Sequence, residues 1–164
     1  MIEYELGSSS LGCVLVAMSK KGVCGIAIAD SADELVDWLQ QKYPHARRAI
    51  DNRVLLSRLQ QILNYSESPD TKLELELDIN GTDFQKRVWQ ALQTVPAGQT
   101  CSYSEIAERI GSPRAVRAVA GACAANSLAL AIPCHRIVRQ NGDLSGYRWG
   151  LERKKILLQK EAAS

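Results

Sequence analysis

The sequence predicts an α/β protein in two parts, an N-terminal part built on a small antiparallel sheet and a mostly helical C-terminal part. Two apolar segments within residues 1–80, joined by Lys20-Lys21, are typical of a β-hairpin. Asn80-Gly81 is a turn dipeptide, and after it apolar residues recur at helical spacing. Within residues 81–164 two short helices meet at Gly111, which indicates a helix-turn-helix. We therefore expect a domain boundary between residues 80 and 81.

End signals and apolar periodicity define the elements of the first part. Ser31 and Glu34 form a capping-box pattern that opens a helix, and Pro44 stops it because proline cannot continue the helical hydrogen bonds. Apolar residues alternate strictly with acidic residues over 73–79, which fits a half-buried strand. The expected elements are strands at 12–19 and 22–29, helices at 31–43 and 48–65, and a strand at 73–79.

The second part shows three further helix starts. Ser112-Pro113 suggests an N-cap followed by proline at the first helical position, and Asn126 is expected in the left-handed conformation that ends that helix. Capping-box pairs precede two other helices. One of these two helices is expected to begin at Thr82 (with Gln85) and the other at Ser102 (with Glu105). Further helices are expected at 113–125 and at 151–161.

Composition narrows the class of protein. Hydrophobic residues make up 46% and charged residues 23% of the chain, as in soluble globular proteins. No apolar run is long enough to span a bilayer, and the N-terminus shows no signal-peptide pattern, so we expect a cytoplasmic protein without a membrane partner. Five cysteines without a C-x-x-C pair, and only two histidines, argue against a disulfide framework and against a metal site.

Charge is distributed unevenly between the two parts. Residues 1–80 hold 8 Lys/Arg and 12 Asp/Glu, a net charge of −4, whereas residues 81–164 hold 12 and 6, a net charge of +6. A basic second part suggests a polyanionic partner such as nucleic acid. An ordinary solvated surface is the alternative.

The expected helix at 113–125 is composed mainly of alanine, valine and glycine, together with Arg114 and Arg117. Small side chains let a helix backbone approach a surface closely, as the narrow minor groove of DNA requires. The same composition is typical of a helix packed tightly in a core. The two arginines favour DNA.

Pro133-Cys134-His135-Arg136 follows the apolar stretch 128–132, which puts Cys134 at the end of a buried segment. A nearby base or cation lowers a thiol pKa and produces the reactive thiolate. Neighbours on a regular strand point to opposite faces, so His135 can act on Cys134 only through a bend or a water. A buried structural cysteine is the alternative. The following loop, 145–150, fits either a pocket wall for a planar ligand or an ordinary turn.

Together these residues resemble the O6-alkylguanine-DNA alkyltransferases, also called methylated-DNA–protein-cysteine methyltransferases. The resemblance is strong from Gly81 to the end and weaker over 1–80. The second part is most similar to the C-terminal half of the bacterial Ada-type adaptive-response protein. The matching features are Pro133-Cys134-His135-Arg136, Arg117-Ala118-Val119, Asn126, Tyr103 and the loop 145–149.

The resemblance implies a fold, a reaction and a partner. The fold would be an N-terminal α/β domain with a ribonuclease-H-like sheet and a C-terminal domain with a winged-helix-like helix-turn-helix. The protein would bind double-stranded DNA in the minor groove and rotate the damaged nucleotide out of the duplex. It would then move the alkyl group from O6 of guanine, and from O4 of methylthymine, to its own cysteine. The reaction would run once per molecule, in a monomer, without a cofactor.

The resemblance also assigns roles to single residues. Cys134 would be the nucleophile, His135 a base acting through a water, and Glu161 the carboxylate that holds this histidine. Asn126 would tie the recognition helix to the cysteine segment, and Tyr103 would interact with the flipped guanine. Trp149 departs from the smaller residue of some relatives, and we expect it to narrow the pocket against bulky O6 groups. The expected DNA-binding residues are Arg117 (which fills the gap in the duplex), Arg114, Ala118, Ala122 and Ser102. The expected base pocket consists of Tyr103, Ile137, Tyr147, Arg148 and Trp149.

Two other functions compete with this interpretation. A DNA-binding module without chemistry explains the helix-turn-helix and the basic second part, but not the cysteine-histidine pair with a distant glutamate. A cysteine hydrolase would use Cys134, His135 and Glu161, but hydrolase nucleophiles usually stand at a helix start, far in sequence from their histidine.

Overall fold

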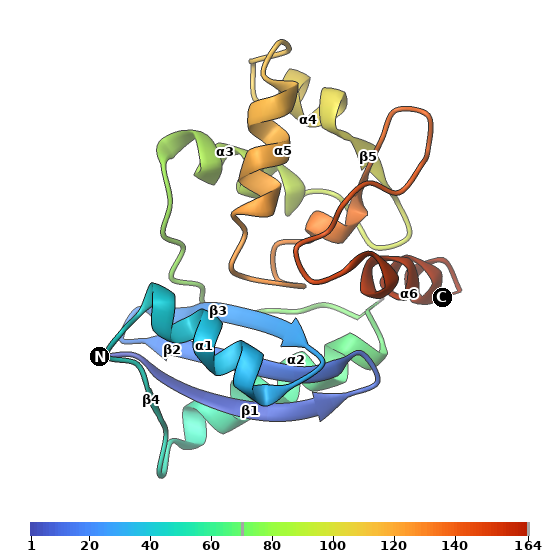
Figure 1. Cartoon of the computed structure of the whole chain (residues 1–164). Coiled ribbons are helices and arrows are strands. Elements are labelled where there is room, and N and C mark those ends of the chain that lie inside the picture. Colours follow the sequence, from blue (N-terminus) through green and yellow to red (C-terminus); the bar gives the residue numbers. More distant parts are fainter. Residues whose placement is uncertain (70, 164) are drawn as a thin grey trace. The chain divides into compact units, whose positions relative to one another are not determined.

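The computed structural model describes residues 1–69 and 71–163, which form two compact units. Unit 1 comprises Met1–Ile79 with Ser127–Ala129, and unit 2 comprises Asn80–Asn126 with Leu130–Ser164. Figure 1 follows the chain through the elements of both units. None of the helices in the described part of the chain combines the length and apolar character that a bilayer crossing requires.

Within the described residues, unit 1 contains a four-stranded sheet in the order β3-β2-β1-β4. Strands β1 (Glu3–Ser9), β2 (Gly12–Ser19) and β3 (Gly22–Ala29) are antiparallel neighbours, and β4 (Arg47–Arg48) runs parallel to β1. The predicted hairpin is therefore confirmed as β2 and β3. The sequence analysis missed β1, since only one of its seven residues, Tyr4, is buried, and glutamates and serines interrupt any apolar run.

Helices α1 (Ala32–Lys42) and α2 (Arg53–Glu67) cover opposite faces of this sheet. A Cβ at Gly7 of β1 would touch α2 leucines, whereas one at Gly25 of β3 would touch Trp38 of α1. These glycines pair with Val14 and Ala17 of β2, whose side chains point to opposite faces because they are three residues apart. Figure 1 shows α1 in front of the strands and α2 behind them.

The second helix begins five residues later than predicted. The Asn52 side chain accepts a hydrogen bond from Leu55 N at 3.0 Å and caps α2 there. The preceding Arg47–Arg48 is held in β4 by its pairing with β1. Ile50, which the helical pattern placed on an apolar face, lies between these elements and is fully exposed. Helix α1, in contrast, begins after its predicted N-cap, Ser31.

The predicted strand at 73–79 is wrong. This segment joins the sheet only at an isolated bridge, in which Val23 bonds to Glu76 O at 2.9 Å and to Asp78 N at 2.8 Å. Further along the same edge of β3, Ile26 bonds instead to Ser127–Ala129. The edge is therefore divided between two segments, which leaves no room for a longer ladder. The leucines remain half-buried and alternate with exposed acids, as the pattern indicated.

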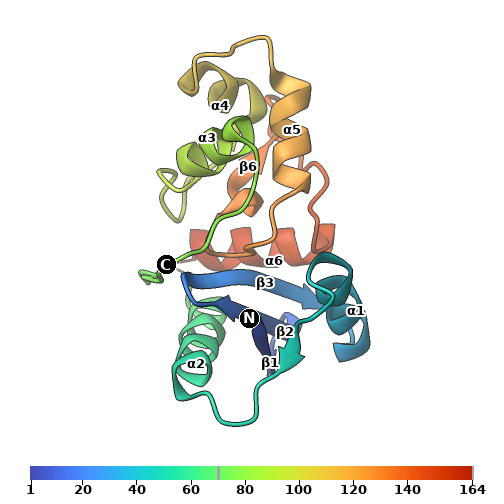
Figure 2. The same cartoon turned by 90° about the vertical axis from the view of Figure 1, so that its left-hand side faces the viewer.

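Unit 2 is mostly helical, and Figure 2 shows its helices from a second side. The predicted capping boxes at Thr82 and Ser102 are confirmed, because in each the N-cap and N3 residues bond reciprocally. A short parallel pairing, which the sequence analysis missed, joins two dipeptides. The elements are α3 (Asp83–Leu92), β5 (Cys101–Ser102), α4 (Tyr103–Arg109), α5 (Val116–Ala124), the 3₁₀ turn η1 (Cys134–Arg136), β6 (Ile137–Val138) and α6 (Leu151–Ala162).

Helix α5 differs from the prediction at both ends. It begins at Val116, without a side-chain cap, because Ser112–Ala115 forms a turn closed by Ala115 N and Ser112 O at 2.9 Å. Pro113 is therefore not at the first helical position. Asn126 is not left-handed either; among the described non-glycine residues only Leu130 has a positive φ, of 71°. The Asn126 amide bonds instead to groups further along the chain.

Helix α5 packs against α3 and α4. The indole Nε1 of Trp89 donates to the carbonyl of Ala122 at 2.9 Å, which fixes α5 on α3. Val119, Ala122 and Cys123 are buried on this side of the helix. The expected core packing and the expected exposed surface of small residues therefore both occur, on different faces of one helix.

Two glycine substitutions should change stability in opposite directions. A Cβ at Gly22, where φ is +147°, would lie 2.5 Å from Glu76 O, so Gly22→Ala should lower the free energy of unfolding by more than about 1 kcal/mol. Gly121 lies within α5 with no atom near its Cβ position, so Gly121→Ala should raise it by about 0.5–1 kcal/mol. Urea unfolding followed by circular dichroism measures both. A Gly22→Ala protein as stable as the wild type would contradict the close approach.

Candidate active site

Unit 2 contains a cavity of about 550 Å³ that brings several predicted residues together. Tyr103 contributes from the start of α4, Arg117 from α5, and Cys134 from η1. Three predicted base-pocket residues also line the cavity: Ile137, Tyr147 and Arg148. The cavity therefore joins the nucleophile candidate, an arginine of α5 and the aromatic loop, which are far apart in sequence.

Cys134 is the first residue of η1 and is 4% exposed. The amide Nδ2 of Asn126 lies 3.3 Å from Cys134 Sγ and donates to Ile132 O at 3.0 Å. The cysteine is thus tied to the end of α5 through the Asn126 side chain. The local backbone is a turn, so the strand geometry that would separate Cys134 from His135 does not occur.

The Cys134 thiol is protonated at rest. Its pKa lies well above the ordinary value of 9.0, first because of the neighbouring Cys123 thiol and then because of burial. The hydrogen bond from Asn126 and the charge of Lys154 act in the opposite direction without overcoming these effects. A base is therefore needed to produce the thiolate.

His135 has the properties of that base. Its ring is fully buried, and Nε2 lies 2.8 Å from Glu161 Oε2. Burial lowers the pKa of His135 below 6.5, although Glu161 opposes this effect, so the ring is neutral near pH 7. Because an ionised carboxylate can only accept, Nε2 carries the proton and Nδ1 keeps its lone pair. Nδ1 is buried and has no hydrogen-bond partner among the described residues.

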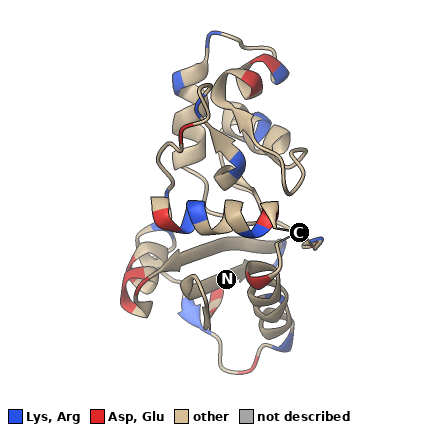
Figure 3. Ribbon diagram, turned by 90° about the vertical axis from the view of Figure 1, so that its right-hand side faces the viewer, with Lys and Arg blue, Asp and Glu red and all other residues tan. Residues whose placement is uncertain are grey.

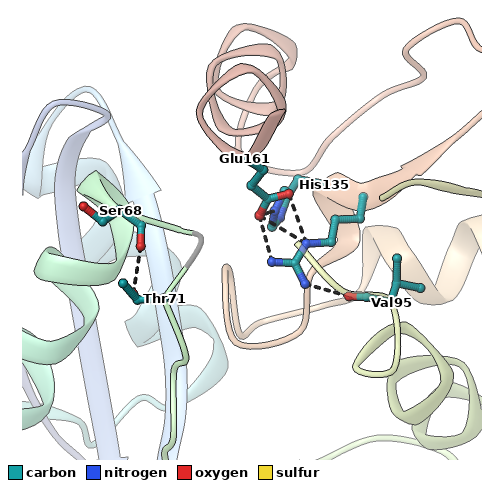
Figure 4. A network of polar contacts seen from close by, with 6 residues as sticks. Ser68, Thr71, Val95, His135 and Glu161 are labelled. Carbon is teal, nitrogen blue, oxygen red and sulfur yellow. Dashed lines mark hydrogen bonds and ion pairs between the residues drawn. The ribbon is translucent and has the colours of Figure 1, made fainter. Parts of the chain in front are cut away.

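Glu161 is shared between His135 and Arg136, as Figure 4 shows for the labelled His135 and Glu161. Arg136 Nη2 donates to Oε2 at 2.7 Å, and Nη1 donates to Val95 O at 2.7 Å. Burial alone would raise the pKa of Glu161, but the hydrogen bonds from His135 and Arg136 outweigh it and lower the pKa. The carboxylate is therefore ionised. The sequence analysis missed Arg136, whose place beside the cysteine-histidine pair was the available signal.

A second polar group borders the cavity. Tyr103 Oη is hydrogen-bonded to Ser145 Oγ, and the ammonium of Lys154 lies 3.3 Å from the same Oγ. The sequence analysis named Ser145 only as part of the loop at 145–150, and it gave Lys154 no role. Lys154 stands in a run of basic residues, which is typical of a solvated helix face. Figure 3 shows both charge signs along α6, yet Lys154 and Glu161 on this helix are buried.

Two residues predicted to bind DNA do not have an accessible side chain. Ala122 is 2% exposed because it packs toward Trp89, and Ser102 is 4% exposed because its hydroxyl caps α4. Arg117 and Ala118 are exposed on α5, and Arg114 is exposed in the turn before it. The accessible surface is therefore smaller than predicted and centres on Arg117.

Trp149 is buried and is not among the residues that line the cavity. The hypothesis that its ring narrows the pocket therefore has no geometric basis. Arg148 lines the cavity instead: its guanidinium lies 5.1 Å from the Trp149 ring centroid and donates to Ala124 O at 2.7 Å. Tyr147 meets the His135 ring edge-on, at 6.3 Å between centroids.

No group of three His, Cys, Asp or Glu in the described residues is arranged to hold a metal ion.

Comparisons with known proteins identify the family of the chain. Residues 83–163 match the family model described as the DNA binding domain of 6-O-methylguanine DNA methyltransferase. The bifunctional transcriptional activator/DNA repair enzyme Ada of Escherichia coli is 49% identical over 161 residues, which cover 98% of this chain and 46% of that protein. The chain thus spans about half the length of that relative.

Other relatives match along nearly their whole length. The methylated-DNA–protein-cysteine methyltransferase of Mycolicibacterium paratuberculosis is 37% identical over 163 residues, which cover 98% of this chain and 93% of that protein. The crystal structure of Mycobacterium tuberculosis OGT in complex with DNA superposes with a TM-score of 0.83 at 33% identity, covering 98% of this chain and 93% of that one. The chain therefore belongs to the family of methylated-DNA–protein-cysteine methyltransferases.

Proposed function

We propose that the protein repairs DNA by moving the methyl group of O6-methylguanine onto its own Cys134, once per molecule. The observation that carries this proposal is the buried, neutral His135. It is held by Glu161 and stands beside a cysteine that faces an open cavity. A thiol with a raised pKa and a neutral base form a pair that stays unreactive until a substrate enters. Family membership supplies the substrate class.

The bonds in this reaction balance without a cofactor. His135 Nδ1 removes the thiol proton of Cys134, through a water, while Glu161 stabilises the imidazolium that forms. The sulfur then attacks the methyl carbon, so that the S–C bond forms as the C–O bond breaks. Guanine departs with the electron pair and takes a hydrogen bond or a proton from the Tyr103 hydroxyl. The thioether product has no leaving group, which makes the protein single-turnover.

DNA would dock on the exposed face of α5. Ala118 and Gly121 on this face are small and exposed, so the helix backbone can approach the minor groove closely. The alkylated oxygen lies inside the base stack, where a buried sulfur cannot approach in line, so the nucleotide has to rotate outward. Arg117 lines the cavity and is exposed, a position from which its planar guanidinium can fill the gap. Ala122 and Ser102 take structural roles.

The remaining assignments extend this proposal. Residues 81–164 would form the DNA-binding and alkyl-acceptor domain, since every residue discussed above lies there, and residues 1–80 a supporting domain. The α4–α5 pair would be a winged-helix-like helix-turn-helix and the sheet of unit 1 ribonuclease-H-like. O4-methylthymine would be a second substrate. The protein would act in the cytoplasm as a monomer. Resemblance to the family supports each of these points.

Stoichiometry tests the proposal directly. Incubation with excess duplex DNA that contains one radiolabelled O6-methylguanine should transfer label until each protein carries one methyl group, located on Cys134 by peptide mapping. Cys134→Ala should transfer none, whereas Cys24→Ala, a buried cysteine of unit 1, should behave like the wild type. Tight binding without transfer would favour the DNA-binding module, and turnover of an ester would favour the hydrolase.

Glu161→Gln should slow methyl transfer and shift its pH dependence. The neutral amide cannot stabilise the imidazolium, so the single-turnover rate at pH 7 should fall by about tenfold or more. Because Glu161 raises the pKa of His135, its removal lowers that pKa further and moves the acidic limb of the rate profile to lower pH. Rapid-quench measurements of the methyl-transfer rate from about pH 5 to about pH 8 cover the range in which histidine titrates. Glu152→Gln, on the exposed first turn of α6, is the matched control. An acidic limb that stayed in place would argue against His135 as the base.

Arg117→Ala should impair reaction with duplex DNA but not with the free base. Unstacking a nucleotide costs a few kcal/mol, so losing the group that fills the gap should slow transfer from duplex DNA by about tenfold to a hundredfold. Reaction with free O6-methylguanine bypasses flipping and should be unchanged. Arg53→Ala, an exposed arginine of unit 1, serves as control. Equal losses with both substrates would place Arg117 in the chemistry rather than in flipping.

A further inference from the structure

Lys154 is a buried cation that the proposed chemistry does not use. Its side chain, on α6, is 0% exposed, and in the part of the chain that the structure describes no carboxylate pairs with it. The ammonium nitrogen lies 3.3 Å from both Ser145 O and Ser145 Oγ. Burying a charge against neutral acceptors costs free energy, so this arrangement calls for a functional explanation.

The lysine is connected to the cavity through Ser145. The Ser145 hydroxyl bonds to the phenol oxygen of Tyr103, and Tyr103 lines the cavity together with Cys134. Ser145 itself also lines this cavity and is 9% exposed. A continuous row of three side chains, Lys154, Ser145 and Tyr103, therefore runs from α6 to the start of α4.

The charge of the lysine sets the direction of this row. An ammonium group has donors only, so Ser145 Oγ accepts from Lys154. Ser145 Oγ keeps a second lone pair, but the positive charge favours the arrangement in which the Ser145 proton points away from the ammonium, to Tyr103 Oη. Tyr103 then accepts this proton and keeps its own for an acceptor inside the cavity. Hydrogen bonds aligned in one direction polarise one another, which makes the terminal phenol a stronger donor.

We infer that Lys154 is a positioning residue, which acts through Ser145 to hold Tyr103 as a hydrogen-bond donor toward the base that departs during methyl transfer. This inference rests on the proposed function. Without the ammonium, the Ser145 hydroxyl is free to accept from Tyr103, and the phenol proton then points away from the substrate. The departing guanine, which gains negative charge, loses its donor in that arrangement.

The effect of Lys154 on Tyr103 depends on pH, because only the protonated lysine carries the charge. Burial lowers the pKa of Lys154 to about 8, while Cys123 and Cys134 act to raise it. The lysine charge acts on Cys134 and His135 from η1 and on Cys123 from α5, and the ammonium bonds directly to Ser145. Burial raises the pKa of Tyr103, so the phenol keeps its proton where the lysine titrates. Donation by Tyr103 is therefore strongest well below pH 8, where the lysine is charged, and declines through pH 8 as the lysine loses its charge.

The inference is tested by single-turnover rates of four proteins with O6-methylguanine duplex DNA, measured from about pH 6.5 to about pH 9.5. The wild-type rate should fall above pH 8. Lys154→Met should react about tenfold more slowly at pH 7, the loss expected for one hydrogen bond to a charged leaving group, and should show no further fall above pH 8. Ser145→Ala, which keeps the lysine, should behave in the same way. Lys155→Met, an exposed lysine of the same helix, should match the wild type.

A double-variant comparison separates positioning from general damage. Lys154→Met should not slow a Tyr103→Phe protein further, because both changes remove the same donor. Methionine is apolar and similar in length, so the Lys154→Met protein should unfold thermally at no lower temperature than the wild type.

The outcomes distinguish the inference from the function on which it rests. If Ser145→Ala retained the wild-type rate and its fall above pH 8, the lysine would act by its field on Cys134 and not through Ser145, and the inference would be wrong. A wild type that transfers methyl as fast as Lys154→Met would refute the inference and leave the function intact. A wild type that transfers no methyl would overturn both.

Discussion

The site depends on the hydrogen bonds and ion pairs that the buried carboxylate of Glu161 makes. One charge accepts hydrogen bonds from His135 and from Arg136, and Arg136 in turn reaches the Val95 carbonyl. The last helix, the 3₁₀ turn and the loop after α3 are thereby joined through the side chains of Glu161 and Arg136. Removal of one partner from a buried ion pair leaves the other uncompensated, at a cost of about 3–5 kcal/mol. The position and tautomer of the histidine follow from this network.

Burial acts on the titratable groups of the site in one consistent direction. It favours the neutral form of Cys134 and of His135, and it lowers the pKa of Lys154. A cysteine that stays protonated is protected from oxidation, because the thiolate is the form that is readily oxidised. Low dielectric also strengthens the few charges that remain, Glu161 with Arg136 and the ammonium of Lys154.

Helix α5 shows how one composition serves two purposes. Its inner face packs closely on α3, as the hydrogen bond from Trp89 to the Ala122 carbonyl requires, and this explains why Ala122 is buried. Its outer face carries Arg117, Ala118 and Gly121, which leave the backbone accessible. Small residues permit both kinds of approach, so composition alone could not assign a residue to either face.

The sequence by itself determined the local features: the β2–β3 hairpin, the capped helix starts at Ser31, Thr82 and Ser102, and the Cys134–His135 pair with its family resemblance. These depend on periodicity and on side chains that bond within three residues. Tertiary structure decided the rest, because it depends on partners distant in the chain. The shared edge of β3 prevents a strand at Leu77, burial removes Ala122 from the exposed face of α5, and Ser145 joins Lys154 to Tyr103. Which distant segments become neighbours is not encoded in the local sequence pattern.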